Sequence, residues 1–237
     1  MRALLLLAGA AAVLAVPTAA SARASLLTPT DLDPALVLPP PPAPGSVQAE
    51  AEAKALRASE TARSPAMLAD ALHDRDTKNA TIFADAVGPA FRLDRLPATA
   101  RLMDEVRAAE KDAADRAKEH FRRSRPWVAA PDLKHCGKDD DADWSSYPSG
   151  HTTMAYSMGA VLARLVPQKA PTILARAARY GESRVMCQVH FRSDVTGGEA
   201  LGLLVAERLM TKPAFQADFA AAQDELAEAG IADRPAR

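Results

Sequence analysis

The sequence lacks an excess of charge of either sign. Its 29 lysine and arginine residues and 30 aspartate and glutamate residues leave a formal net charge of −1 over 237 residues. Proteins that bind nucleic acid through its phosphate backbone usually carry a basic excess. We therefore expect no nucleic-acid partner, and any binding site for an anion must be local.

Long apolar runs are missing beyond the first sixteen residues. Residues 1–22 have the pattern of a secretory signal peptide, with Arg2 at the start, an apolar core at Ala3–Val16 and small residues at Ala20–Ala22. An uncleaved membrane anchor is the alternative, but about fourteen apolar residues are few for crossing a bilayer. We expect an exported protein with no membrane insertion after signal cleavage.

Glycine is scarce as well, with 11 residues, whereas alanine is abundant and alternating strand patterns are few. This composition predicts an all-α protein, and one domain over residues 47–237 suits the length. Helical periodicity and breaking residues predict helices at about 47–60, 65–75, 77–87, 98–122, from just after His151 to about 165, 171–185, 195–210 and from 213 onward. Gly197, Gly198 and Gly202 lie in one of these helices and predict a close approach to a neighbour.

Residues 23–46 form a Pro-rich segment before this domain. Four consecutive prolines, Pro39–Pro42, favour an extended polyproline conformation. The segment is either a linker or an arm on the domain surface, and we favour the arm because no other domain precedes it.

The sequence contains two cysteines, Cys136 and Cys187. In an oxidising compartment an even number favours a disulfide, and two buried thiols that never meet are the alternative.

Residues 145–152 read Ser-Ser-Tyr-Pro-Ser-Gly-His-Thr, and apolar residues with helical spacing follow them. A glycine-containing turn at the start of a helix presents free backbone N–H groups and the positive end of the helix dipole, which suits an anion. Read alone, the stretch is equally compatible with an ordinary capped helix.

Three clusters of cationic and acid–base side chains stand out. They are Lys118 with Arg125-Pro126, Pro148-Ser149-Gly150-His151, and Ser183-Arg184 with His190 and Asp194. Each cluster has an ordinary explanation by itself, such as a helix end or a local hydrogen bond. Together they suit phosphoryl transfer, because arginine and lysine bind phosphate oxygens and two histidines can divide the nucleophile and acid roles.

The spacing of these clusters resembles the three-part signature of the type-2 phosphatidic acid phosphatase (PAP2) superfamily. Residues 146–152 and 181–185 further resemble the class A bacterial non-specific acid phosphatases, as do the Pro-rich arm and both cysteines. The resemblance extends from about Pro34 to Phe219. Ser145 departs from the family pattern, which has glycine there, and we expect a local change in the turn but none in the chemistry.

The resemblance implies a helical-bundle core and a periplasmic enzyme that hydrolyses small phosphomonoesters. It implies that His190 attacks phosphorus, that Asp194 orients His190, and that His151 protonates the leaving group. It assigns phosphate binding to Lys118, Arg125, Ser149, Gly150 and Arg184. No metal and no other cofactor is expected, phosphate transfer to other alcohols is possible, and a homo-oligomer is compatible with the sequence.

Other interpretations remain. The same pocket binds vanadate in related haloperoxidases, but the short chain and class A features argue against that activity. A non-catalytic phosphate-binding protein would need neither histidine. The spacing of Asp139, Asp141 and Asp143 resembles a calcium loop, but Trp144 and Gly150 occupy positions that need glycine and glutamate, so a solvated loop is expected.

Overall fold

The protein is described by a computed structural model, which covers residues 24–136 and 142–234. The expected signal peptide at 1–22 and the acidic residues 139–141 lie outside the described residues. Within the described ranges all regular structure is helical, as the composition predicts, and no strand occurs there. The elements are α1 (Pro34–Val37), α2 (Val47–Ala62), α3 (Pro65–Asp76), η1 (Ala80–Phe83), α4 (Ala84–Val87), η2 (Leu93–Arg95), α5 (Pro97–Phe121), α6 (Pro126–Ala129), α7 (Gly150–Leu165), η3 (Pro167–Lys169), α8 (Ala170–Met186), α9 (Arg192–Met210) and α10 (Pro213–Glu228).

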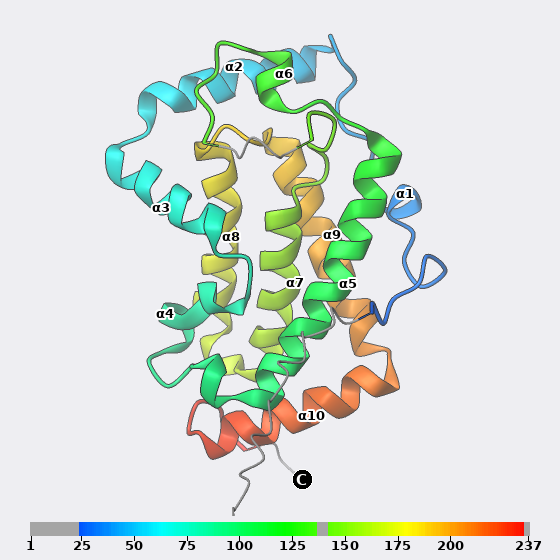
Figure 1. Ribbon diagram of the computed structural model, residues 1–237, viewed down its shortest axis with the longest axis vertical. Coiled ribbons are helices and arrows are strands. Elements are labelled where there is room, and N and C mark those ends of the chain that lie inside the picture. Colours follow the sequence, from blue (N-terminus) through cyan, green and yellow to red (C-terminus); the bar gives the residue numbers. More distant parts are fainter. Residues whose placement is uncertain (1–23, 137–141, 235–237) are drawn as a thin grey trace, which may run out of the picture.

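Helix α7 forms the centre of a bundle with α5, α8 and α9 around it (Figure 1). Its apolar side chains and those of the α5 stripe are buried in one continuous core; on α5 these include Leu102, Val106 and Ala113. Leu and Val side chains each stabilise the folded state by about 1.5–3 kcal/mol when fully buried. Burial of these apolar faces against one another determines the relative positions of the four helices.

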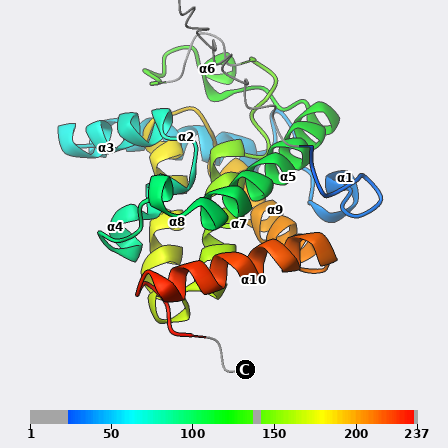
Figure 2. The ribbon, with the colours of Figure 1, turned by 60° about the horizontal axis from the view of Figure 1, so that its bottom comes forward.

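Two helices close the ends of the bundle. Helix α10 crosses one end (Figure 2), where Phe215 and Leu226 are buried and Glu225 accepts hydrogen bonds from the first N–H groups of α5. The short helix α6 lies at the other end with α2, as Figure 1 shows. The C-terminal end of α5, the N-terminal ends of α7 and α9 and the C-terminal end of α8 all point toward this second end.

Helices α7 and α9 approach closely because glycine lies between them. A Cβ atom at Gly202 would lie 2.6 Å from the carbonyl oxygen of Thr153, and one at Gly198 would lie 2.7 Å from that of Ser149. Both distances are too short for a real side chain. The close helix packing expected from the small residues of α9 is confirmed.

The segment before α2 packs on the bundle. Leu27, Leu32 and Leu38 are buried in the main core, and the Tyr147 hydroxyl donates a hydrogen bond to the Pro39 carbonyl at 2.7 Å. The segment also contains the short helix α1, which periodicity alone did not predict, because Asp33 caps it and Pro34 opens it.

The helix expected at 77–87 is broken in the structure. Residues 77–79 form no helix, and Asn79 then caps the 3₁₀-helix η1, which leads into α4. The loop after α5 likewise contains the four-residue helix α6.

Candidate active site

A cleft of about 270 Å³ opens between α5, α7, the end of α8 and the end of α3 with the residues that follow it. It is lined by Arg75, Lys78, Arg107, Glu110, Lys111, Ala114, Asp115, Lys118, Arg125, Gly150, His151, Met154, Arg184, Val189 and His190. Of the eight residues assigned to catalysis and phosphate binding, all but Ser149 and Asp194 line this cleft. These two lie buried beneath it.

His190 enters the cleft from a sharp turn between α8 and α9. Gln188 takes the left-handed backbone conformation there, with φ of 55°, and its side chain donates a hydrogen bond to the Leu56 carbonyl. The imidazole of His190 is only 2 % exposed, and its Nε2 atom lies 2.9 Å from Nη1 of Arg125. Because a guanidinium only donates, this contact makes Nε2 an acceptor and leaves the proton on Nδ1.

The pKa of His190 lies well below its usual range. Burial is the largest cause, and the charges of Arg125, Lys118 and Arg184 add to it, while a backbone hydrogen bond with Ser146 acts in the opposite direction. The imidazole is therefore neutral and carries a free electron pair on Nε2, which is the state that a nucleophile needs.

Asp194 lies in the first turn of α9, behind His190. Its Oδ2 atom is 3.5 Å from Nδ1 of His190, and the same oxygen accepts hydrogen bonds from the Ser146 hydroxyl at 2.6 Å and the Phe191 N–H at 2.8 Å. The other oxygen accepts one from Arg123 at 2.5 Å. Asp194 is thus fixed by three donors, and it approaches His190 without a short hydrogen bond.

Burial raises the pKa of Asp194, and Arg123 together with the hydrogen-bond donors acts against burial. Arg123 in turn donates to Glu52 of α2 at 2.8 Å, and Glu52 also accepts the Ser193 N–H. A buried charge needs a paired partner to remain charged. The chain of contacts from Glu52 through Arg123 to Asp194 supplies one, and neither Glu52 nor Arg123 was assigned to the site from the sequence.

Three cationic side chains of the signature surround the space in front of His190. Arg125 donates to the Val189 carbonyl at 2.9 Å, and Arg184, only 1 % exposed, donates to the Ala71 carbonyl at 2.5 Å. A Cβ atom at Gly150 would lie 3.2 Å from Nζ of Lys118, so the absence of a side chain there lets the lysine reach the start of α7. The three cations and the N-terminus of α7 thus gather positive charge around one space, an arrangement (the cradle below) that would suit an anion.

Ser149 has a structural position. Its hydroxyl caps α7 by accepting from the Thr152 N–H and from the Thr152 hydroxyl at 3.0 Å, and its own N–H donates to the Asp194 carbonyl at 2.9 Å. These bonds join the starts of α7 and α9. Its assignment to phosphate binding stays a prediction, as do the roles of the other assigned residues.

Ser145 contacts the site more closely than the sequence indicated. Its hydroxyl accepts from Nη2 of Arg125 at 3.2 Å. A glycine at this position has no such group. The expectation that this departure leaves the chemistry untouched stays a prediction, although the hydroxyl contacts Arg125, one of the residues assigned to phosphate binding.

His151 faces His190 from the first turn of α7. Its Nε2 atom lies 3.1 Å from the carbonyl oxygen of Arg75, at the end of α3. Burial lowers the pKa of His151 well below its usual range, and the charges of Arg184 and Lys78 lower it further. A proton on His151 therefore requires either acidic solution or a bound anion.

The structure joins Cys136 and Cys187 in a disulfide. The bond links the loop after α6 to the end of α8, three residues before His190. The backbone adds a hydrogen bond from the Cys136 N–H to the Cys187 carbonyl at 2.9 Å.

Four cations of the cleft lie outside the signature: Arg75, Lys78, Arg107 and Lys111. On α5, Arg107, Lys111 and Lys118 fall on one helical face, which is a signal that the sequence contained. Arg75 at the end of α3 and Lys78 after it gave no such signal, because only the tertiary fold brings them beside α7.

Among the described residues, no helix is long and apolar enough to span a bilayer. The same residues contain no group of three or more His, Cys, Asp or Glu side chains that is arranged to hold a metal ion.

Comparison with known proteins gives consistent matches. Residues 111–216 match the model of the PAP2 superfamily. The chain is 30% identical over 202 residues to the acid phosphatase of Zymomonas mobilis, covering 83% of this chain and 76% of that protein. It is 33% identical over 153 residues to non-specific acid phosphatases of Salmonella typhi and Providencia stuartii, covering 62% and 63% of this chain and 60% and 61% of theirs.

Among solved structures, a transmembrane PAP2-type phosphatidylglycerolphosphate phosphatase from Bacillus subtilis matches with a TM-score of 0.47 and 20% identity, over 69% of this chain and 85% of that chain. The sequence relatives show the family, above all the Zymomonas protein with its long match. The chain therefore belongs to the PAP2 superfamily, among its non-specific acid phosphatases.

Proposed function

We propose that this protein is an exported, metal-independent acid phosphatase that hydrolyses small phosphomonoesters through a phosphohistidine intermediate. The observation that carries the proposal is a buried, neutral His190, which faces His151 across a cleft lined by Lys118, Arg125 and Arg184. The acid phosphatase relatives support the reaction class.

In the first step, Nε2 of His190 attacks phosphorus. A bond forms between nitrogen and phosphorus, the bond from phosphorus to the leaving oxygen breaks, and His151 donates a proton to that oxygen. In the second step water attacks the phosphohistidine, His151 takes a proton from the water, and phosphate leaves as His190 is restored. Another alcohol in place of water would give phosphate transfer.

The cations stabilise the charge that spreads over the phosphoryl oxygens in the transition state. Arg125 lies 2.9 Å from Nε2 of His190, so a phosphate oxygen that enters this space can take over its N–H donor. Arg184 is held at the Ala71 carbonyl and Lys118 lies at the start of α7. Because these cations are already in position before the substrate binds, no free energy is needed to reorganise them during the reaction.

Asp194 stabilises the positive charge that develops on His190 as the new bond forms. Its negative charge lies 3.5 Å from Nδ1. Arg123 and Glu52 act as positioning residues, because they hold Asp194 and neither of them lines the cleft.

Export rests on the signal-like residues 1–22 and on the disulfide, because disulfides persist in oxidising compartments. Removal of the signal peptide from protein recovered outside the cytoplasm would be seen by N-terminal sequencing. Recovery of active protein with an intact N-terminus in the cytoplasm would contradict export.

Hydrolysis of p-nitrophenyl phosphate with and without EDTA tests the reaction. We expect activity to survive chelation and to be inhibited by vanadate, which can occupy the cradle as a mimic of the pentacoordinate transition state. Loss of activity in EDTA, with recovery after addition of a divalent cation, would contradict metal independence.

Trapping of the phosphoenzyme tests the intermediate. Labelled substrate and quenching in alkali should give labelled wild-type protein, and no label should appear in His190→Ala. His73→Ala is the matched control, because it removes a histidine that lies outside this cleft. Label that persists in His190→Ala would mean that another residue attacks.

A further inference from the structure

Ser183 belongs to the third of the signature clusters, yet neither chemistry nor phosphate binding is assigned to it. It does not line the cleft. Its hydroxyl donates a hydrogen bond to Oδ2 of Asp74, on α3, at 2.6 Å. The signature therefore contains a residue that connects α8, which carries Arg184, with α3.

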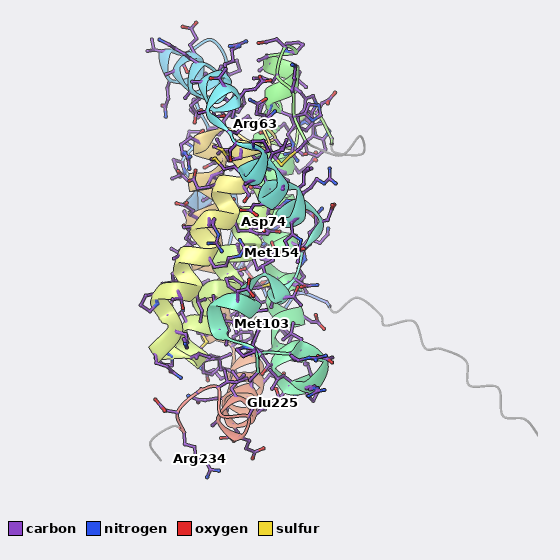
Figure 3. All side chains as sticks on the ribbon, turned by 90° about the vertical axis from the view of Figure 1, so that its left-hand side faces the viewer. Arg63, Asp74, Met103, Met154, Glu225 and Arg234 are labelled. Atoms are coloured by element: carbon purple, nitrogen blue, oxygen red, sulfur yellow. A yellow bond between two sulfur atoms is a disulfide. The ribbon has the colours of Figure 1, made fainter. Side chains whose placement is uncertain are left out.

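Asp74 is a buried carboxylate that the proposed mechanism does not use. It is 3% exposed, and its Oδ1 atom accepts a second hydrogen bond, at 2.5 Å, from Arg176 of α8. A buried charge is stable only when it is paired and hydrogen-bonded. These contacts fix the last turn of α3 to α8. Figure 3 shows Asp74 and Met154, which lines the cleft, at neighbouring heights along the bundle.

Tyr180, also on α8, fixes the residue that ends α3. Its side chain is fully buried, and its hydroxyl donates a hydrogen bond to the carbonyl of Thr77, the C-cap residue, at 2.6 Å. Asp74 and Thr77 lie on either side of Arg75 in the chain. The backbone of Arg75 is thus held on α8 both before and after it.

The carbonyl oxygen of Arg75 lies 3.1 Å from Nε2 of His151, which we assign as the general acid. A carbonyl only accepts, so Nε2 carries a proton and Nδ1 is the atom that can exchange a proton with a ligand. Burial and the charges of Arg184 and Lys78 lower the pKa of His151, and this hydrogen bond acts in the opposite direction. The carbonyl therefore favours the protonated imidazole, which a general acid needs.

We propose that Asp74 and Tyr180 position the general acid, because they hold the Arg75 carbonyl against Nε2 of His151. The proposal rests on the proposed function, which assigns the acid role to His151. In the first step the proton on Nδ1 passes to the leaving oxygen, and in the second step Nδ1 takes a proton from water. The proton on Nε2 stays at the carbonyl throughout. Asp74 and Tyr180 are positioning residues, since neither of them lines the cleft.

NMR of the intact, ¹⁵N-labelled protein tests the contact without any turnover. Above the pKa of His151, the proton of the neutral ring should be on Nε2 in the wild type, and its signal is identified by its loss in His151→Ala. This proton should exchange with water about tenfold faster in Asp74→Asn and in Tyr180→Phe, because the hydrogen bond is weakened. A proton on Nδ1 in the wild type, or unchanged exchange in both variants, would overturn the proposal.

The leaving group supplies a readout that a purely structural role would not change. Both variants should lower kcat/KM for an alkyl phosphate by about tenfold and that for p-nitrophenyl phosphate much less, because an alkoxide needs the proton more. Inhibition by inorganic phosphate, which reports the cradle, should be nearly unchanged. Equal losses for the two substrates, or an equal loss of phosphate binding, would mean that α3 supports the fold or Arg184, and would overturn the proposal.

A matched control makes the same chemical change at the far end of the bundle. Glu225 accepts hydrogen bonds from the Ala98 and Thr99 N–H groups at 2.9 and 2.8 Å, so Glu225→Gln should lower stability and leave the ratio of the two kcat/KM values unchanged. An equal change of the ratio in Glu225→Gln would overturn the proposal. If Asp74→Asn does not fold, Tyr180→Phe decides, because it removes one hydroxyl and keeps the ring beside His151.

Double variants show whether the effect passes through His151. Asp74→Asn added to His151→Ala should leave the ratio of kcat/KM values nearly as it is in His151→Ala, since the positioned group is absent. A further loss of about tenfold would overturn the proposal. Slow Nε2 exchange that depends on Asp74, in a protein without phosphatase activity, would support the contact and contradict the proposed function. Activity that falls equally for both substrates would leave that function standing and contradict the positioning role.

Discussion

The two histidines of the cleft share the same electrostatic environment, but the mechanism that we propose needs them in opposite protonation states. Burial and neighbouring cations lower the pKa of both His190 and His151. This favours His190, which must be neutral to attack, and it opposes His151, which must carry a proton. A phosphate group with two negative charges offsets the cations, so substrate binding helps to protonate His151.

The first prediction concerns the leaving group. His151→Ala should slow hydrolysis of an alkyl phosphate by about 10²–10⁴-fold, and that of p-nitrophenyl phosphate much less, because p-nitrophenolate leaves without much help from a proton. The comparison should use kcat/KM, which is not affected by a slow second step. Equal losses for both substrates would mean that His151 binds phosphate or supports the fold and that the proton comes from another group.

The second prediction concerns pH. The protonated form of His151 is required, so kcat/KM for an alkyl phosphate should fall as the pH rises through the pKa of this group in the free enzyme, which lies below the usual 6.5. Lys78 contributes to this lowering, so Lys78→Gln should raise the pKa and move the alkaline limb to higher pH.

The pH profile is measured with one substrate in the wild type, Lys78→Gln and Lys169→Gln, so that ionisation of the substrate, with a second pKa of about 6, is common to all three. Lys169→Gln, at an exposed position of η3, should retain the wild-type profile. If the alkaline limb of Lys78→Gln lies at the same pH as that of the wild type or at a lower pH, a group other than His151 determines the limb.

At the scale of residues, the sequence could predict the groups that belong to the signature but not those that only the fold supplies. Lys118, Arg125 and His190 have a fixed spacing within their own segments, which identified them. Glu52 and Lys78 come from distant segments, and no spacing relates them to the site. Their position depends on how α2 and α3 cross the bundle.

At the scale of helices, the contact between α7 and α9 connects the core with the site. The capping residue Ser149 at the start of α7 packs against Gly198 of α9 and binds the backbone of Asp194. If the distance between α7 and α9 increased here, Asp194 on α9 would move away from His151 and the cradle at the start of α7. The small residues of α9 are thus a condition for the geometry of the site.

The third prediction is that Gly202→Ala destabilises the protein. Alanine favours a helix by about 1 kcal/mol over glycine, but its methyl group would lie 2.6 Å from the Thr153 carbonyl oxygen. Overpacking of this kind typically costs about 1–3 kcal/mol, so we expect a net decrease in the free energy of unfolding.

Denaturant unfolding measures this change, and Thr196→Ala on the exposed side of α9 is the control, with little expected effect. A stabilised Gly202→Ala variant would show that the helix propensity outweighs the close contact.

The long helices could be predicted from the sequence because their apolar periodicity is strong and clear stops bound them. Short elements were less predictable. Residues 77–87 have helical composition, yet the Asn79 cap interrupts them, and the crossing of α3 over α8 depends on the buried side chain of Asp74. Local propensity contains no information about such a crossing.

At the scale of the whole molecule, the disulfide encloses the loop that leads to the cradle. Cys136 and Cys187 are 51 residues apart, and residues 148–151 lie between them. The bond restricts the unfolded chain as well as the folded one. The sequence favoured a disulfide from the compartment and the even number of cysteines alone.

The fourth prediction is that removal of this bond lowers stability. The double variant Cys136→Ala, Cys187→Ala should lose about 2–4 kcal/mol in the free energy of unfolding. Dithiothreitol should produce a similar loss in the wild type and none in the double variant. Two free thiols in unreduced wild-type protein, detected by mass spectrometry, would contradict the bond.

The helix ends define two poles of the molecule, and substitutions at the two poles should have different consequences. Every group assigned to chemistry lies where α5, α7, α8 and α9 end or begin beside α6, whereas α10 lies across the far pole (Figure 1). Substitutions at the far pole can alter the stability of the protein, and so its lifetime in the cell, and leave its selectivity among substrates unchanged. New substrate preferences should therefore arise through changes in the short segments of the near pole. The rest of the chain can diverge as long as it keeps the ends of these four helices in the same relative positions.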